Sequence, residues 1–231
     1  MEVCVLNKSS YEPKINFGHG EKQNNPYPLR DRAIVAATTV LGVAASSAVL
    51  AKGAGYSLNP AKMFKNISKS YLAKVDFHAK QIIGIGIGSC LGGLAGGYIV
   101  DKDESNRKAK RRETVMQIGN ISIPILTVDF LANWGKKFGR VAQAVFAISG
   151  IFLGVTIANL LMNQLGNFIF LNKNDARKVK PSDYSAHLDD MVAAASYISS
   201  APLVKKIARL VPVALMVAGN EVGNKKAKHN A

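Results

Sequence analysis

The stretch SDYSAHLDD, residues 182–190, holds the densest group of side chains in the sequence that could bind a metal ion or transfer a proton. If Ser182 caps a helix, then Asp183, His187 and Asp190 fall within about 60 degrees of one helix face. Carboxylate and imidazole groups arranged in this way could hold a divalent metal ion or act as an acid–base pair. The same residues also suit an ordinary surface helix, because an aspartate in the first turn complements the helix dipole.

A second candidate for chemistry is the uncharged stretch IIGIGIGSCLGGLAGGYIV, residues 82–100, which contains seven glycines. Gly86, Gly88 and Gly92 approximate the glycine-rich turn that holds a dinucleotide phosphate. That turn works only between a strand and a helix, with a second strand to follow. Here the stretch leads instead into the charged run DKDESNRKAKRRE. We therefore expect helix packing at these glycines, no nucleotide site and no cofactor.

Placed on a helix, the glycines form two seams on nearly opposite faces. The first seam consists of Gly84, Gly88, Gly92 and Gly96, and the second of Gly86, Gly93 and Gly97. Small residues at this spacing let helix backbones approach closely in lipid, where apolar burial does not drive helices together. The pattern is similar to the glycine-zipper segments of several unrelated membrane and envelope proteins. This resemblance concerns packing only and implies no activity.

Polar side chains also interrupt the apolar parts of the sequence. Asp129 is the one acidic residue within an apolar segment, which makes it a functional candidate by default. A polar stripe within about 80 degrees of one helix face consists of Thr156, Asn159, Asn163 and Asn167. Amides inside a membrane need hydrogen-bond partners, and Asn120, Asp129 and Asn133 are candidates across a short hairpin. We interpret the stripe as interhelical hydrogen bonding, with a lined polar path as the alternative.

These residues must be positioned by long apolar segments. Charged residues are absent from four runs, namely 33–51, 81–100, 114–128 and 141–171, the third of which continues past Asp129 to Trp134. A membrane-crossing helix needs about 20 apolar residues, whereas a soluble helix of that length keeps one charged face. The runs therefore predict three or four membrane helices. The mean hydropathy of +0.09 is low for such a protein, which keeps a soluble helical protein as an alternative.

The segments between the runs are mostly basic. Residues 60–80 read as an amphipathic helix whose lysines would meet anionic lipid headgroups at a membrane surface. These lysines are Lys62, Lys65, Lys69, Lys74 and Lys80. Residues 101–113 read as a charged connection, and we expect Pro124 and Asp129 to interrupt the segment that follows. Prolines and basic residues within 191–219 predict a pair of short helices.

The charge and the cysteine content limit which binding partners and which covalent links we expect. The net charge of +15 is spread over every connection and is not gathered on one module, so we expect a membrane surface, not nucleic acid. Cys4 and Cys90 form no disulfide framework. Arginines concentrate in the segments that share a side with the N-terminus, which predicts a cytoplasmic N-terminus. A cleaved signal at residues 33–51 is the alternative to a retained first helix.

The sequence thus predicts an all-α fold: a small helical membrane bundle of three or four apolar helices, one basic amphipathic interfacial helix and a C-terminal pair of short helices. Its organisation would be a disordered basic arm at 1–30, a membrane-associated domain at 31–220 and a basic tail at 221–231. We expect a non-enzymatic scaffold or self-associating membrane component, with a homo-oligomer as a possible state. The alternatives are a small permeation bundle and a soluble basic helical protein, either an enzyme or an anion or nucleic-acid binder.

Overall fold

A computed structural model describes residues 27–55, 79–170, 177–185, 187, 191, 194 and 211–227. Every regular element within these residues is a helix, so the all-α prediction is confirmed for the described part of the chain. The elements are α1 (Leu29–Gly53), α4 (Ala79–Val100), α5 (Glu104–Gly135), the 3-10 turn η2 (Lys136–Phe138), α6 (Arg140–Phe170), α7 (Pro181–Ser185) and α10 (Val211–Gly223).

Four of these helices, α1, α4, α5 and α6, are long and apolar enough to cross a membrane by length and composition. This number agrees with the three or four that the uncharged runs predict. The 31 residues of α6 would extend for about 46 Å at 1.5 Å per residue, more than the roughly 30 Å of a bilayer core. The longest helices are therefore several turns longer than the apolar core of a bilayer is thick.

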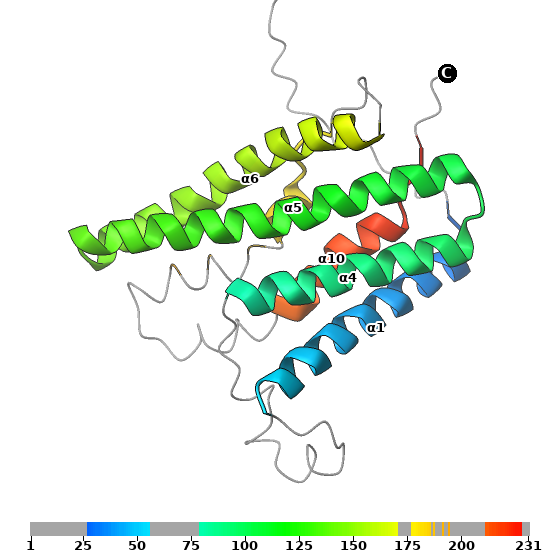
Figure 1. The fold of residues 1–231 in the computed structure, drawn as a ribbon, viewed down its shortest axis with the longest axis horizontal. Helices are drawn as coiled ribbons and strands as arrows, with labels where there is room; N and C mark the ends of the chain where they lie inside the picture. The colour runs from blue at the N-terminus through cyan, green and yellow to red at the C-terminus, as the bar shows by residue number, and fades with distance from the viewer. Residues whose placement is uncertain are drawn as a thin grey trace, which may run out of the picture.

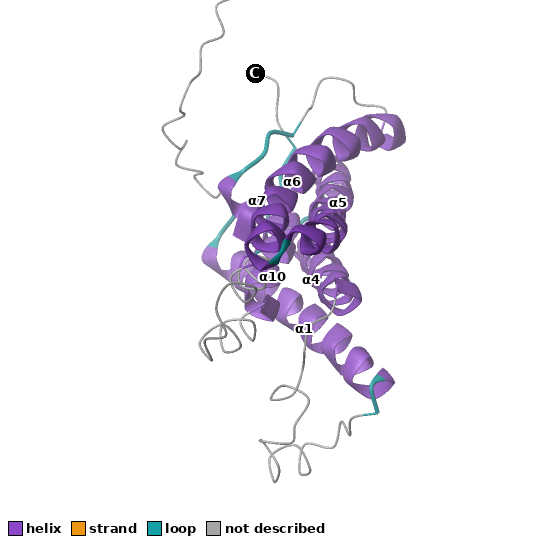
Figure 2. Cartoon of the chain, turned by 90° about the vertical axis from the view of Figure 1, so that its left-hand side faces the viewer, coloured by secondary structure: helices purple, strands orange, loops and turns teal. Residues whose placement is uncertain are grey.

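The helices are arranged as two antiparallel pairs with α10 placed among them (Figure 1). Helices α1 and α4 run in opposite directions, since Gly96 lies beside Val35 and Gly84 lies beside Leu50. Helices α5 and α6 form a hairpin through η2, and α10 packs against α1, α4 and α5. Figure 2 shows the resulting order, with α6 and α5 first, then α10 and α4, and α1 last.

The charged run after α4 differs from the prediction. Only residues 101–103 form the connection, because α5 already begins at Glu104. Asp103 is its N-cap, and the Asp103 side chain accepts a hydrogen bond from the Ser105 amide at 2.9 Å. The lysines and arginines that follow are good helix formers, so a run that reads as a loop by its charge continues as three turns of helix.

The predicted interruption at Pro124 and Asp129 is also wrong. Helix α5 continues through both residues to Gly135, where the chain turns into η2. Gly139 then takes a φ of 103°, a left-handed conformation that other residues rarely adopt, and α6 starts at the next residue. The sharp turn of this hairpin therefore lies at Gly139 and not at the proline.

Several predicted elements fall wholly or partly outside the described residues. Of the basic helix at 60–80, only Ala79 and Lys80 are described, and both belong to the first turn of α4. Of the range 191–219 that was predicted to hold the C-terminal pair, residues 211–219 belong to α10, which carries Pro212 in its first turn where the missing N–H breaks no helical bond. The arm is described only from Tyr27 onward.

Candidate functional site

The first glycine seam of α4 faces α1. A side-chain carbon at Gly88 would lie 2.7 Å from the Gly42 carbonyl oxygen, and one at Gly92 would lie 3.1 Å from the Gly42 Cα. At Gly96 it would lie 2.9 Å from the Cα of Val35. Gly84 differs, because a carbon there would make an ordinary contact at 3.5 Å with the Leu50 side chain. Three of the four glycines in this seam thus bring two backbones together.

The second seam faces α10. A side-chain carbon at Gly93 would lie 2.9 Å from the Gly219 Cα, and one at Gly97 would lie 2.8 Å from the Gly223 carbonyl oxygen. One helical turn before these contacts, the buried Ser89 hydroxyl donates to the Leu215 carbonyl at 2.7 Å. Gly86, the remaining member, would meet the Ile121 side chain of α5 at 2.9 Å. Both seams are therefore occupied by helices of the same chain.

The α5–α6 hairpin uses close approach as well. A side-chain carbon at Gly150 would lie 2.8 Å from the Cα of Val128. One at Gly154 would lie 2.9 Å from the Cβ of Pro124. These two glycines of α6 let the helix pass directly over the proline turn of α5.

Pro124 leaves one backbone carbonyl of α5 without its usual hydrogen-bond donor, and His187 contacts that carbonyl. A proline has no N–H, so the carbonyl four residues earlier in the helix, that of Asn120, loses its usual donor. The His187 Nε2 atom lies 2.9 Å from the Asn120 carbonyl oxygen, and the His187 side chain is fully buried. Because a carbonyl only accepts, His187 must carry its proton on Nε2 to make this bond. The ring therefore replaces the donor that the proline removes, which lets α5 continue unbroken.

A buried ion-pair cluster lies where α5 begins and α10 ends. Its centre is Arg177, whose guanidinium donates to Asp183 at 2.8 and 2.5 Å and to Glu113 at 3.0 Å. Burial alone would lower the pKa of Arg177, but the hydrogen bonds to Asp183 and the attraction of Glu113 raise it. Arg177 thus stays charged and holds two carboxylates from separate parts of the chain.

The cluster extends to α10 and the residues after it. Lys225 pairs with Glu113 at 2.9 Å, and Glu221 lies 3.7 Å from both Arg177 and Lys180. The Gln117 amide donates to Glu221 at 2.7 Å. Three carboxylates therefore meet three cations, which satisfies the requirement that charges removed from water be paired. The predicted basic tail contributes to this cluster, since Lys225 lies within 221–231.

A second buried group ties the start of the described chain to the same end. The Tyr27 hydroxyl donates to Asp101, and Lys110 Nζ donates to Tyr27 at 2.6 Å and to the Lys225 carbonyl at 2.6 Å. Lys110 is also ion-paired with Asp101 at 3.3 Å. Burial would raise the pKa of Asp101, but the Tyr27 hydroxyl, the Asp103 amide and Lys110 lower it. Burial, and after it Asp101, raises the pKa of Tyr27, so its hydroxyl keeps the proton that it donates.

The sequence analysis missed most of this charged end, although a signal was present. Five polar residues recur on α5 at alternating spacings of four and three, which keeps them on one helix face. They are Asn106, Lys110, Glu113, Gln117 and Asn120, and all five are buried. The net charge of the run concealed this pattern, because only one of its six basic residues, Lys110, belongs to the buried face.

Two residues of the predicted metal or acid–base group are described, and each has another partner. Asp183 is held by Arg177, His187 contacts the Asn120 carbonyl, and Asp190 lies outside the described residues. Within the described part of the chain, no three His, Cys, Asp or Glu side chains gather in a way that could hold a metal ion.

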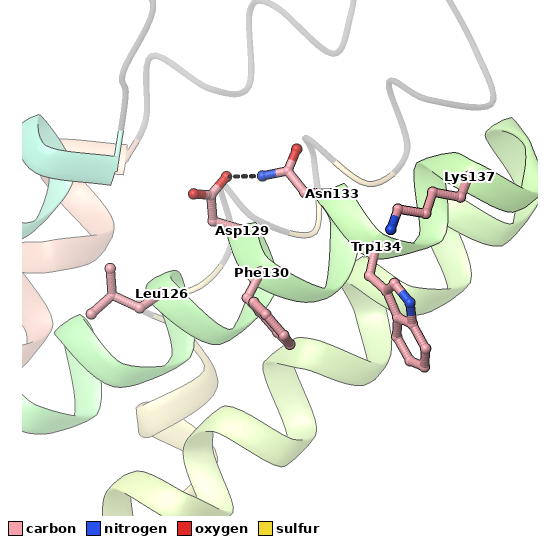
Figure 3. A pocket seen from close by; sticks show the side chains of 6 residues that line it. All are labelled: Leu126, Asp129, Phe130, Asn133, Trp134 and Lys137. Atoms are coloured by element: carbon pink, nitrogen blue, oxygen red, sulfur yellow. Dashed lines mark hydrogen bonds between the residues drawn. The ribbon is translucent and has the colours of Figure 1, made fainter.

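The polar stripe of α6 makes different contacts from those predicted across the hairpin. Asn163 bonds the backbone N–H and carbonyl of Arg177, each at 2.8 Å, and is 3.4 Å from Asn159. Asn167 accepts from Arg112 at 2.9 Å, and the exposed Thr156 bonds its own helix. Its expected partners across the hairpin lie elsewhere: Asp129 accepts from Asn133 at 3.3 Å on an exposed face of α5 (Figure 3).

Comparison with known proteins adds no relative. No family model, no curated protein and no solved structure matches this chain. Conclusions about function therefore depend on the geometry described above.

Proposed function

We propose that the chain is a polytopic integral membrane protein that acts as a non-enzymatic scaffold, with four helices crossing the bilayer. The observation that carries this proposal is the exposure of large apolar side chains on helices of spanning length. The most apolar window of α1 has a mean hydropathy of 2.0, yet only 17% of it is buried inside the protein. Phe130 of α5 and Phe168 of α6 are 71% and 80% exposed. Such surfaces on several helices suit contact with lipid and not with water.

The internal contacts support a packing role for the glycines. In lipid the helices gain little from hiding apolar area from each other, so close backbone approach and hydrogen bonds must hold them. The contacts of α4 with α1 and α10 have this character. Because both seams face helices of the same chain, a homo-oligomer of this scaffold would associate through the outer faces of α1, α5 or α6. The permeation alternative gains no comparable support, since Asn163 and Asn167 are engaged with Arg177 and Arg112.

Carbonate washing of membranes that contain the full chain tests the proposal. We expect the protein to remain in the pellet, because four lipid-exposed apolar helices cannot be displaced by high pH. Recovery in the soluble fraction would contradict the membrane proposal and favour the soluble alternative.

Cysteine labelling tests the orientation. We propose a cytoplasmic N-terminus, which puts the α4–α5 connection on the cytoplasmic side and the end of α1 on the opposite side. A membrane-impermeant maleimide applied to intact cells should then label Lys52→Cys and leave Lys102→Cys unlabelled until the membrane is permeabilised. The reverse labelling pattern would invert the proposed topology.

A further inference from the structure

The turn between α5 and α6 gathers aromatic side chains at the end of the bundle opposite the ion pairs. Trp134 lies edge-on to Phe146 and Phe138, with ring centroids 5.1 and 6.2 Å apart, and Phe138 stacks on Phe146 at 6.2 Å. Trp134 and Phe138 nevertheless remain 49% and 65% exposed. Tryptophan concentrates at membrane–water interfaces because its ring is apolar and its N–H is polar. The cluster therefore fits a position at headgroup depth.

The same turn carries three cations that form no ion pair with any described carboxylate. Lys136, Lys137 and Arg140 are all exposed, and among the described residues no carboxylate forms an ion pair with them. The sequence has no Asp or Glu from residue 130 to residue 174. The N-terminus of α6 at Arg140 adds to the positive potential at this point. The turn thus complements an anion outside the chain.

The face of α5 that leads to the turn is hollowed (Figure 3). A hollow of about 570 Å³ lies along Leu126, Phe130 and Trp134, with Lys137 at its end and Asp129 and Asn133 also lining it. Asp129 accepts a hydrogen bond from Asn133, and it is not among the ion-pair partners of Lys137 in the described residues. A largely apolar hollow that ends at a cation matches the shape of a phospholipid, with an acyl chain along the helix and a phosphate at Lys137.

We propose that the α5–α6 turn is a binding site for anionic phospholipid, with Lys136, Lys137 and Arg140 contacting the phosphate and Leu126 and Phe130 contacting the acyl chain. The inference rests on the proposed membrane function. It is consistent with the length of the apolar part of α5, since the 21 residues from 114 to 134 extend for about 31 Å. That length brings the turn to one bilayer surface when the ion-pair cluster lies at the other.

Trp134 provides a direct probe, because it is the only tryptophan in the chain. The full chain is reconstituted in vesicles in which either phosphatidylglycerol or phosphatidylcholine carries bromine, and quenching of Trp134 fluorescence is compared. We expect brominated phosphatidylglycerol to quench more strongly at equal content, because the turn enriches it locally. Lys136→Gln with Lys137→Gln should lower the preference for phosphatidylglycerol by roughly 25-fold, since each lysine contributes about fivefold.

A matched control has the same loss of charge at the other end of the bundle. Lys102→Gln with Lys108→Gln replaces two exposed lysines near the ion-pair cluster and should leave the preference unchanged. Equal quenching of the wild type by the two brominated lipids would overturn the lipid site, as would equal loss of preference in both double variants. If neither lipid quenches and carbonate extracts the protein, the membrane proposal itself fails. The two failures are therefore distinguishable.

Discussion

The middle of the bundle and its charged end are held together by different interactions. Where α4 meets α1 and α10, the backbones approach closely at Gly88, Gly92 and Gly93, and the polar side chains that pack beside them are small hydroxyls, those of Thr38, Ser46 and Ser89. At the end where α5 begins, Arg177 and Lys110 join segments far apart in sequence through buried ion pairs. Helix α5 belongs to both regions, since it carries Glu113 at one end and packs beneath Gly150 and Gly154 farther along.

The difference follows from the surroundings that we propose for each region. In lipid a charge is expensive and apolar contact confers little selectivity, so shape and backbone approach must determine which helices meet. At the bilayer surface, ions can be desolvated at lower cost, and paired charges specify which segments meet. The comparison predicts that removing one charged partner destabilises the charged end. In the middle of the bundle, added side-chain volume should destabilise the contacts between helices.

Arg177→Met should have the largest effect. The variant leaves Glu113 and Asp183 buried without their common partner, and breaking a buried pair in this way costs about 3 to 5 kcal/mol. We expect a large fall in the melting temperature of the detergent-solubilised protein. The matched control is Arg111→Met, which removes an exposed pair with Glu104 and should cost less than about 1 kcal/mol. Similar melting temperatures for the two variants would contradict the assignment of Arg177 as the centre of the cluster.

Gly93→Ala should have the next largest effect. The added carbon would collide with the Gly219 backbone, so α4 and α10 must move apart, and overpacking of this kind costs about 1 to 3 kcal/mol. Gly84→Ala makes the same change on the same helix where there is room, and alanine should then stabilise α4 by up to about 1 kcal/mol. Opposite shifts in melting temperature are the expected result. A loss of stability in both variants would mean that α4 tolerates no substitution at its glycines, whatever the space.

These two regions also differ in how far the sequence predicts them. Uncharged runs of about 20 residues identify α1, α4, α5 and α6, because length and hydropathy are local properties. The partner of each glycine seam is not local, and no spacing within 82–100 says that one seam faces α1 and the other α10. Likewise, Arg177 reads as one basic residue among many until the fold brings it to Glu113, 64 residues away. The high net charge of the run before Glu113 predicts a solvated connection, and it therefore obscures the buried polar face of α5.

The proline in α5 was the clearest error of the sequence analysis, and a double-mutant cycle examines its explanation. His187→Ala should cost about 1 to 3 kcal/mol, because it leaves the Asn120 carbonyl buried and without a donor. In a Pro124→Ala background, residue 124 regains its N–H and supplies that donor, so the same His187→Ala change should cost clearly less. The measurement is the coupling between the two changes in melting temperature. Additive effects would show that His187 stabilises the bundle by another contact.

The acid response of Asp101 should be the smallest effect, and it concerns the charged end alone. Tyr27, the Asp103 amide and Lys110 lower the pKa of Asp101, so the folded state favours its ionised form. This contribution to stability is complete above the ordinary aspartate pKa of about 3.9 and is lost as the pH falls below it toward the lowered pKa. Asp101→Asn should therefore be less stable than the wild type at neutral pH, and the difference in melting temperature should narrow as the pH falls through about 4. A difference in melting temperature that stays constant with pH would mean that Asp101 acts through its shape and not through its charge. The Tyr27–Asp101–Lys110 group would then resemble the glycine contacts more than the ion pairs beside it.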